Sequence, residues 1–167
     1  TKVVARQVFD SRGFPTIEAE VFCKNISTKA ICPSGASTGS YEAYEKRDKN
    51  NKKYLGKSVF KAVYFVNKII SKKILKKNVH NQELIDSILI KLDGTNQKTK
   101  LGANSILSVS MAVKKLSAKI KNIPLYKNFF IKKNFKLPFP LMNIINGGAH
   151  ANNCLLYTSD AADDRMR

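Results

Sequence analysis

Residues 15–23, Pro-Thr-Ile-Glu-Ala-Glu-Val-Phe-Cys, carry the pattern that decides the fold of this chain. Ile17, Ala19 and Val21 alternate there with threonine and glutamate residues. Successive side chains of a strand point to opposite faces of a sheet, so an apolar period of two indicates a strand with one buried face. We therefore expect a half-buried strand over residues 15–23.

Two further strands flank this one. Residues 2–9 precede it across the turn Asp10-Ser11-Arg12-Gly13-Phe14-Pro15, and residues 26–32 follow it after the turn Lys24-Asn25. Strands that follow one another through short turns usually pair with each other. The sequence therefore predicts an antiparallel three-stranded meander.

A helical stretch is expected after the strands. Val59, Val63, Val66 and Ile70 recur at the spacing of one helix face. Ser58 stands directly before them, and a serine there favours a helix start because its hydroxyl can accept a hydrogen bond from the backbone of the first turn. We expect Ser58 to be the N-cap.

Two longer helices and one short helix are expected next. The first begins near Asn81, stops at Asp93-Gly94-Thr95, and carries Leu84, Ile88 and Leu92. The second runs from Ala103 to about Ile120 and contains small residues that allow close packing, and a short helix opens at residues 123–126. Strands followed by helices predict an α+β domain.

Residues 137–146, Leu-Pro-Phe-Pro-Leu-Met-Asn-Ile-Ile-Asn, are almost wholly apolar and are followed by two glycines. A strand that is apolar on both faces is typical of a parallel sheet covered on both sides. We expect this run to be the first strand of a second domain, with one domain over residues 1–130, a linker and domain start over 131–153, and a separate tail over 154–167.

Residues 33–39, Pro-Ser-Gly-Ala-Ser-Thr-Gly, have almost no apolar area to bury and are expected to form a ligand-binding loop or a surface turn. Gly35 to Gly39 also fits the G-x-S-x-G nucleophile elbow, with Asp93 and His150 in the order of a hydrolase triad. That motif needs a parallel strand before it and a buried helix after it. The expected antiparallel meander before the loop and the polar run 41–47 after it both argue against a nucleophile elbow. The remaining interpretation is a loop whose serine reaches a metal or a phosphate.

Composition narrows the classes of function. The chain has 167 residues, three cysteines and a formal net charge of +18. Its lysines are spread over every expected helix, and no nucleic-acid-binding motif accompanies them, so nucleic acid is not expected as the main partner. No apolar run is long enough to cross a membrane, no signal peptide stands at the N-terminus, which also lacks a methionine, and the odd cysteine count suits reduced thiols.

A series of motifs occurs in order along residues 2–153: Asp10–Thr16, Pro33–Gly39, Glu42-Ala43 with Arg47-Asp48, Leu92–Thr95, Leu101–Asn104, Pro124–Tyr126 and Asn143–Ala151. In this order they closely resemble the N-terminal part of the enolase (phosphopyruvate hydratase) family. The resemblance implies a cytoplasmic lyase of glycolysis that interconverts 2-phosphoglycerate and phosphoenolpyruvate through an enediolate. It also implies an N-terminal α+β domain beside an α/β (TIM-like) barrel, two Mg²⁺ ions, and a homodimer or larger homo-oligomer.

The resemblance assigns roles to a few residues of this sequence. Ser37 would be the loop ligand of the second Mg²⁺, and Ala36 would lie against the substrate through its backbone. His150 would contact the substrate near its phosphate and leaving-group side. Arg6 and Arg12 would lie near the dimer interface of the family.

The resemblance ends after Asn153. The family continues with a strand whose glutamate binds substrate nine residues after the histidine, and this chain has Ser159 there. The tail 154–167 looks like translated sequencing adapter, with a natural fusion or splice end as the alternative. The lysine base, the general-acid glutamate and the three carboxylate metal ligands of the family all lie beyond residue 153, so the chain as written is expected to be inactive.

Two other functions stay open from the sequence. One is a different enzyme of the enolase superfamily, although the serine-rich loop would not be expected there. The other is a non-catalytic role in which a basic enolase binds RNA or a surface.

Overall fold

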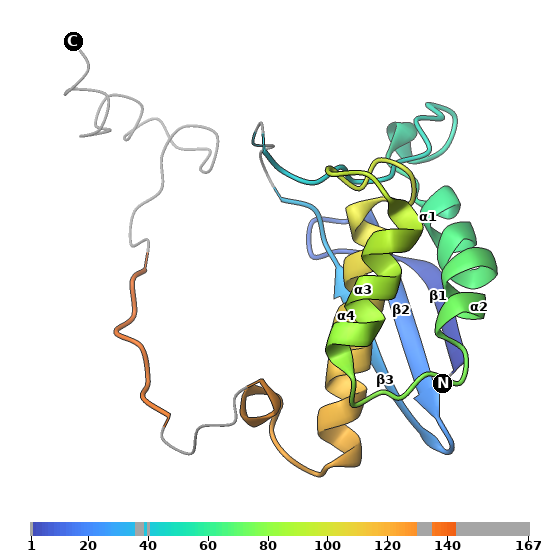
Figure 1. Ribbon diagram of the computed structural model, residues 1–167. Coiled ribbons are helices and arrows are strands. Elements are labelled where there is room, and N and C mark those ends of the chain that lie inside the picture. Colours follow the sequence, from blue (N-terminus) through green and yellow to red (C-terminus); the bar gives the residue numbers. More distant parts are fainter. Residues whose placement is uncertain (1, 36–38, 40, 130–134, 143–167) are drawn as a thin grey trace. The chain divides into compact units, whose positions relative to one another are not determined.

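The computed structural model describes residues 2–35, 39, 41–129 and 135–142. The chain divides into two units, Thr1–Ile131 and Lys132–Arg167. The first unit holds a three-stranded sheet with helices on one face of it (Figure 1). The α+β fold class is therefore confirmed.

The sheet consists of β1 (Lys2–Phe9), β2 (Pro15–Cys23) and β3 (Ile26–Cys32) in the order β1-β2-β3, all antiparallel. Both strand bounds and topology match the prediction. Ala19 in the central strand lies opposite Ala5 on one side and Ala30 on the other. These small side chains lie under the helices, which lets the helices approach the sheet closely.

The alternation in β2 has the predicted meaning. Ile17, Ala19 and Val21 are fully buried against the helices. Glu18 and Glu20 lie on the opposite face, where both bind the guanidinium of Arg6 at 2.6 and 2.7 Å. One face of the sheet is therefore core and the other carries charge.

Residues 60–74 form one helical stretch made of α1 (Phe60–Phe65), a π-helical turn η2 (Val66–Ile70) and α2 (Ser71–Ile74). Val66 and Ile70 are fully buried, as their spacing indicated. Ser58 is not the N-cap: Val59 takes that position without a side-chain bond. The carboxylate of Asp48 accepts the backbone N–H groups of Phe60 and Lys61 instead, at 2.8 and 2.9 Å.

The two longer helices have the predicted extents. α3 is Gln82–Asp93, where the Asn81 side chain accepts from Leu84 N and Gly94 ends the helix with φ 72°. α4 is Ala103–Ile120. The buried face of α3 differs slightly from the expected one. Ile85 and Leu89 are fully buried, whereas Leu84, which was expected on that face, is 40% exposed.

Helix α4 packs on β2 and β3, helices α1 and α2 pack on β1, and α3 packs on α4. Small polar residues of α4 are buried at these contacts, among them Ser105 and Ser108. The Thr28 hydroxyl of β3 donates to the Ala112 carbonyl of α4 at 2.8 Å. The described residues of this unit also contain two short 3-10 helices, η1 (Tyr54–Gly56) and η3 (Leu125–Asn128), and η3 confirms the short helix expected after residue 123.

The strand expected over residues 137–146 is not confirmed. Its described part, residues 137–142, contains no helix and no strand. A strand is held by hydrogen bonds to neighbouring strands, and the described residues offer none to this run. Among the described helices none is long and apolar enough to span a membrane.

Candidate functional site

The loop 33–39 leaves the end of β3, and its described residues are held by side chains from elsewhere in the chain. Arg12, in the turn between β1 and β2, donates from Nη2 to the carbonyl of Ser34 at 2.6 Å and to that of Gly35 at 3.4 Å. At the other end, the Glu42 carboxylate accepts from Gly39 N at 3.0 Å, and Glu42 N donates to the Gly39 carbonyl at 3.1 Å. Both ends of the loop are therefore fixed.

Arg47 joins four segments of the chain at the base of this loop. Its Nη1 donates to the carbonyls of Pro15, at 2.6 Å, and Lys57. Its Nη2 donates to Ser34 Oγ at 2.7 Å and pairs with Glu45 Oε1 at 2.8 Å. A planar guanidinium presents five donors in a fixed fork, which suits it to bridge several acceptors at once. The side chain is only 16% exposed, so these bonds lie largely away from water.

Ser34 completes this cluster. Its hydroxyl accepts from Arg47 and donates to Glu45 Oε2. The loop entrance is thereby bonded through both its backbone, to Arg12, and its side chain. A fixed entrance limits where the residues that follow can lie.

Asp10 holds the turn that carries Arg12. Its Oδ1 accepts from the backbone N–H groups of Phe14 and Arg12, each at 2.9 Å. The hydrogen bond from Phe14 N–H keeps the pKa of Asp10 below its usual range. Burial of the carboxyl raises the pKa, but the hydrogen bond from Arg12 N–H adds to the lowering. The carboxylate is therefore charged at neutral pH, and its Oδ2 lies 3.7 Å from the guanidinium of Arg12.

Residues 41–48, which contain Glu45 and Arg47, form no helix or strand and are fixed by long-range bonds instead. The side chain of Asn104 at the start of α4 accepts from Lys46 N at 3.0 Å and donates to the Lys46 carbonyl at 3.1 Å. Gly102 has φ 93°, and a Cβ there would lie 2.4 Å from Cβ of Lys46. Only glycine fits this close approach.

A family model described as Enolase, N-terminal domain, matches residues 1–129. The chain belongs to the enolase family. The enolase of Pelagibacter ubique (strain HTCC1062) is 73% identical over 154 residues, which cover 92% of this chain and 37% of the relative. The enolase of Malacoplasma penetrans (strain HF-2) is 49% identical over 163 residues, 92% of this chain and 36% of the relative. The chain therefore spans little more than a third of the length of the curated enolases that it matches.

The structure describes some of the residues that the enolase resemblance singled out and does not describe others. Ala36, Ser37 and His150 lie outside the described residues. Arg6 is described and lies on the uncovered face of the sheet, where its partners are Glu18 and Glu20. Arg12, expected like Arg6 near the dimer interface, lies at the base of the loop 33–39, where it donates to the carbonyls of Ser34 and Gly35.

The nucleophile-elbow alternative has no structural support in this enolase domain. The strands before the loop are antiparallel, and residues 41–47 after it form no helix. Asp93, the acid of that triad, is 3% exposed and uses its carboxylate within its own turn, accepting from Leu101 N at 2.7 Å and Thr95 N at 3.0 Å. Asp93 is a structural residue.

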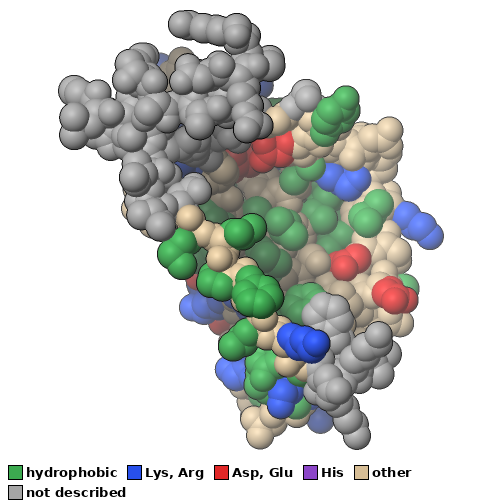
Figure 2. All heavy atoms as spheres, turned by 90° about the vertical axis from the view of Figure 1, so that its left-hand side faces the viewer, with side chains coloured by type: hydrophobic (Ala, Val, Ile, Leu, Met, Phe, Trp, Pro, Cys, Tyr) green, Lys and Arg blue, Asp and Glu red, His purple; other side chains and the backbone are tan. Residues whose placement is uncertain are grey.

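No group of three histidine, cysteine, aspartate or glutamate side chains gathers to hold a metal among the described residues. On the face drawn in Figure 2 the basic and acidic side chains are scattered rather than gathered. Magnesium prefers several oxygen ligands, usually with carboxylates among them. The described part of this enolase chain thus provides no complete magnesium site of its own.

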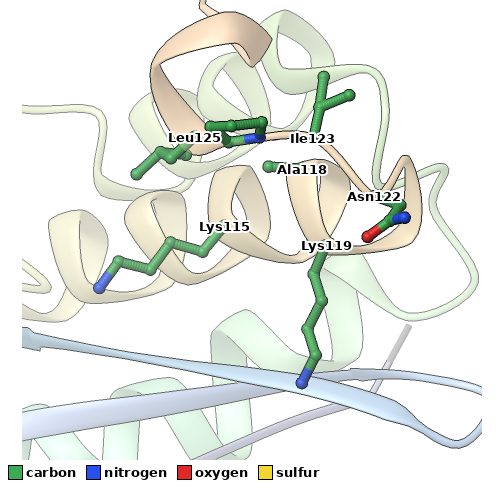
Figure 3. Close-up of a pocket in the computed structure, with 7 residues that line it drawn as sticks. Lys115, Ala118, Lys119, Asn122, Ile123 and Leu125 are labelled. Carbon is green, nitrogen blue, oxygen red and sulfur yellow. The ribbon is translucent and has the colours of Figure 1, made fainter.

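A hollow of about 490 Å³ lies elsewhere, between the end of α4 and residues 122–125 (Figure 3). The ammonium groups of Lys115 and Lys119 reach from its rim to β3, where they donate to the carbonyls of Lys29 at 3.3 Å and Ser27 at 3.1 Å. These bonds cover acceptors on the edge strand of the sheet. The hollow is a feature of packing and has no catalytic side chains around it.

The sequence did not reveal the cluster of Ser34, Glu45 and Arg47. Ser34 and Arg47 stand in the motifs that carry the enolase resemblance and Glu45 does not, and no spacing rule connects the three. One feature of the sequence could have drawn attention to Arg47. It stands next to Asp48 in a polar run that has no helix or strand pattern, and charged side chains in such a run usually pair with groups elsewhere in the fold. The partners themselves depend on tertiary contacts.

Proposed function

We propose that this chain is the N-terminal domain of an enzyme that interconverts 2-phosphoglycerate and phosphoenolpyruvate plus water. The 73% identity to a curated enolase, over most of this chain, is the observation that carries the proposal. The reaction removes a proton next to a carboxylate and passes through an enediolate. Enzymes of this superfamily use a lysine or histidine base with one or two Mg²⁺ ions, and the bound metal stabilises the negative charge of the intermediate.

The part of this chain in the reaction is to present the loop 33–39 to the substrate. Ser37 would contribute its oxygens to the second Mg²⁺, and Ala36 would contact the substrate through its backbone. His150 would contact the substrate near the phosphate and the leaving group. The hydrogen bonds of Arg12 and Glu42 to the loop ends support a role in which the loop is held from both sides.

The remaining ligands and the acid and base belong, in this proposal, to a barrel domain of the parent protein. The hydroxyl and carbonyl oxygens of one serine are a weak site for Mg²⁺ without carboxylates. We therefore expect no turnover from the 167-residue chain alone. Residues 1–130 would belong to the N-terminal domain and 131–153 to the start of the barrel domain.

The tail 154–167 would then be foreign to the parent gene. Both curated relatives match 92% of this chain, which leaves uncovered a share about the size of this tail. The parent enzyme would be cytoplasmic and a homodimer or larger homo-oligomer. Arg6 is 46% exposed on the charged face of the sheet, which supports a place for it at or near a subunit interface.

The test begins with the source DNA. Sequencing across codon 153 should show a frame that continues into an apolar strand, with a glutamate nine residues after His150 and a full barrel domain. The completed protein should form phosphoenolpyruvate from 2-phosphoglycerate, followed by its ultraviolet absorbance, only with Mg²⁺ present. The 167-residue chain serves as the inactive control. A folded full-length product without turnover would refute the proposal, and turnover by the short chain would refute the claim that the catalytic groups lie beyond it.

A further inference from the structure

We propose that the exposed side of residues 60–74 binds single-stranded nucleic acid. In this proposal Lys61, Lys68 and Lys72 contact successive phosphates, and the ring of Tyr64 stacks on a base. We refer to these four residues as the lysine stripe. This binding is independent of the catalytic function proposed above.

The stripe follows from the helical geometry of α1, η2 and α2. Lys61, Tyr64, Lys68 and Lys72 are spaced by three and four residues, which places them on one side of a helix. All four are exposed, and Tyr64 keeps 57% of its surface in solvent. At a rise of 1.5 Å per residue, Lys61 and Lys72 stand about 16 Å apart along the axis, enough for a few nucleotides of extended strand.

Acidic residues are missing from the stretch of sequence that contains the stripe. Residues 49–82 contain ten lysines and no aspartate or glutamate, although the whole chain has 12 acidic residues. A general preference for lysine explains the lysines but not the missing acids. The acidic residues that flank this range in the sequence are Asp48 and Glu83. Asp48 is bonded to the backbone of Phe60 and Lys61 at the start of α1. A local positive potential attracts the phosphate backbone of a nucleic acid.

The burial of the same helical stretch argues against a lipid surface. A helix that binds a bilayer inserts an apolar face into it. Here the apolar side, Ala62, Val66, Ile70 and Ile74, is fully buried in the protein core. The exposed residues of this stretch are lysines and aromatic rings, and Figure 1 shows α1 and α2 at the edge of the helical layer.

An exposed ring among phosphate-binding cations favours a single strand over a duplex. Aromatic side chains stack on unpaired bases, and cations along the same groove follow the backbone. Tyr64 lies between Lys61 and Lys68 in the sequence of the stripe, so one base can stack while its neighbouring phosphates meet ammonium groups. Phe60, 47% exposed and lying under the ammonium of Lys53, offers a second ring close to the first.

The experiment measures binding of the 167-residue chain to a fluorescent uridine oligomer of about twelve nucleotides by anisotropy, over salt from about 50 to about 200 mM. The triple variant Lys61→Gln, Lys68→Gln, Lys72→Gln should bind more weakly. It should also lower the slope of log K against log salt by about 2, since each phosphate contact on a single strand contributes about 0.7. The matched control Lys24→Gln, Lys91→Gln, Lys100→Gln removes the same charge from exposed sites elsewhere and should keep the slope of the original chain.

A second variant separates stacking from charge. Tyr64→Leu should weaken binding at least roughly fivefold without changing the salt slope, and Tyr64→Phe should restore it. Circular dichroism checks that each variant is folded. Equal loss in the two lysine triples would overturn the proposal, because binding would then follow net charge alone. Absence of oligomer binding, or binding only to phosphatidylglycerol vesicles, would overturn it too.

Discussion

Arg47 and Ser34, 13 residues apart, meet at 2.7 Å between Nη2 and Oγ, and this bond joins the entrance of the loop 33–39 to the polar segment after it. Glu45 closes the cluster from the same segment, since it pairs with Arg47 and accepts from Ser34. The loop 33–39 follows β3 directly, and these side chains hold its entrance in place. The position of the loop entrance depends on these side chains.

Replacing Arg47 by methionine should destabilise the domain by about 2–4 kcal/mol, because Ser34, Glu45 and two backbone carbonyls lose a largely buried partner. Urea unfolding followed by circular dichroism measures this change. The exposed variant Lys24→Gln should unfold as the original chain does. A loss under about 0.5 kcal/mol, the usual size of a surface effect, would show that the cluster is dispensable.

Gly102→Ala should be the more harmful of two glycine substitutions. Its new Cβ would lie 2.4 Å from Cβ of Lys46 at φ 93°, so the segment that holds Arg47 must move away from α4. Gly13 also has positive φ, 75°, but nothing lies within 4 Å of its missing Cβ, so Gly13→Ala should cost only about 1 kcal/mol. Thermal unfolding of both variants gives the comparison, and equal losses would contradict the close packing at Gly102.

Stability should fall in acid partly through Asp93. Burial would raise the pKa of this carboxyl, but the Leu101 N–H and the Thr95 groups outweigh burial and hold the pKa below its ordinary value of 3.8. Its contribution is therefore present above that ordinary value and is lost as the pH falls through the lowered folded-state pKa. Asp93→Asn should be less stable at neutral pH and should lose less stability between about pH 5 and pH 2. If the free energy of unfolding of the original chain and of the Asp93→Asn variant changed in parallel with pH, this account would be contradicted.

The Cys32 thiol should react slowly with iodoacetamide. Burial, and secondarily the carboxylate of Glu45, raise the pKa of Cys32 to about 11, so little thiolate forms near pH 8. Cys23 provides the comparison within the same molecule, in a Cys154→Ser background that leaves two thiols. Mass spectrometry of each peptide over time should show Cys32 as the slower site. Faster alkylation of Cys32 than of Cys23 would show that the thiol is more accessible or more acidic than described.

The secondary structure of the first unit was predictable because local signals agreed with one another. The period-two pattern around Ile17 set the strand bounds, and Asn81 and Gly94 marked the ends of α3. The start of α1 was wrong in detail, because Asp48, distant in sequence, supplies the helix cap that Ser58 was expected to supply. A serine just before a helix therefore does not identify the cap when the fold brings a carboxylate to the same backbone N–H groups.

The sequence indicated which residues belong to the site, but not how they contact one another. Motifs pointed to the loop 33–39, but the cluster that holds its entrance joins residues 12, 34, 45 and 47 through contacts that no spacing encodes. The apolar run 137–146 shows the opposite problem. Its composition indicates a strand, yet its described part has none, because a strand also needs neighbours to pair with.

The central claim is that residues 1–129 are the N-terminal domain of a working enolase, and a hybrid enzyme tests it most directly. These residues would replace the matching part of the Pelagibacter ubique enolase, 73% identical to this chain. We predict Mg²⁺-dependent formation of phosphoenolpyruvate with kcat/KM within about tenfold of the unaltered relative, and a loss of at least about tenfold on Ser37→Ala in the hybrid. A hybrid that folds but forms no phosphoenolpyruvate would contradict the account.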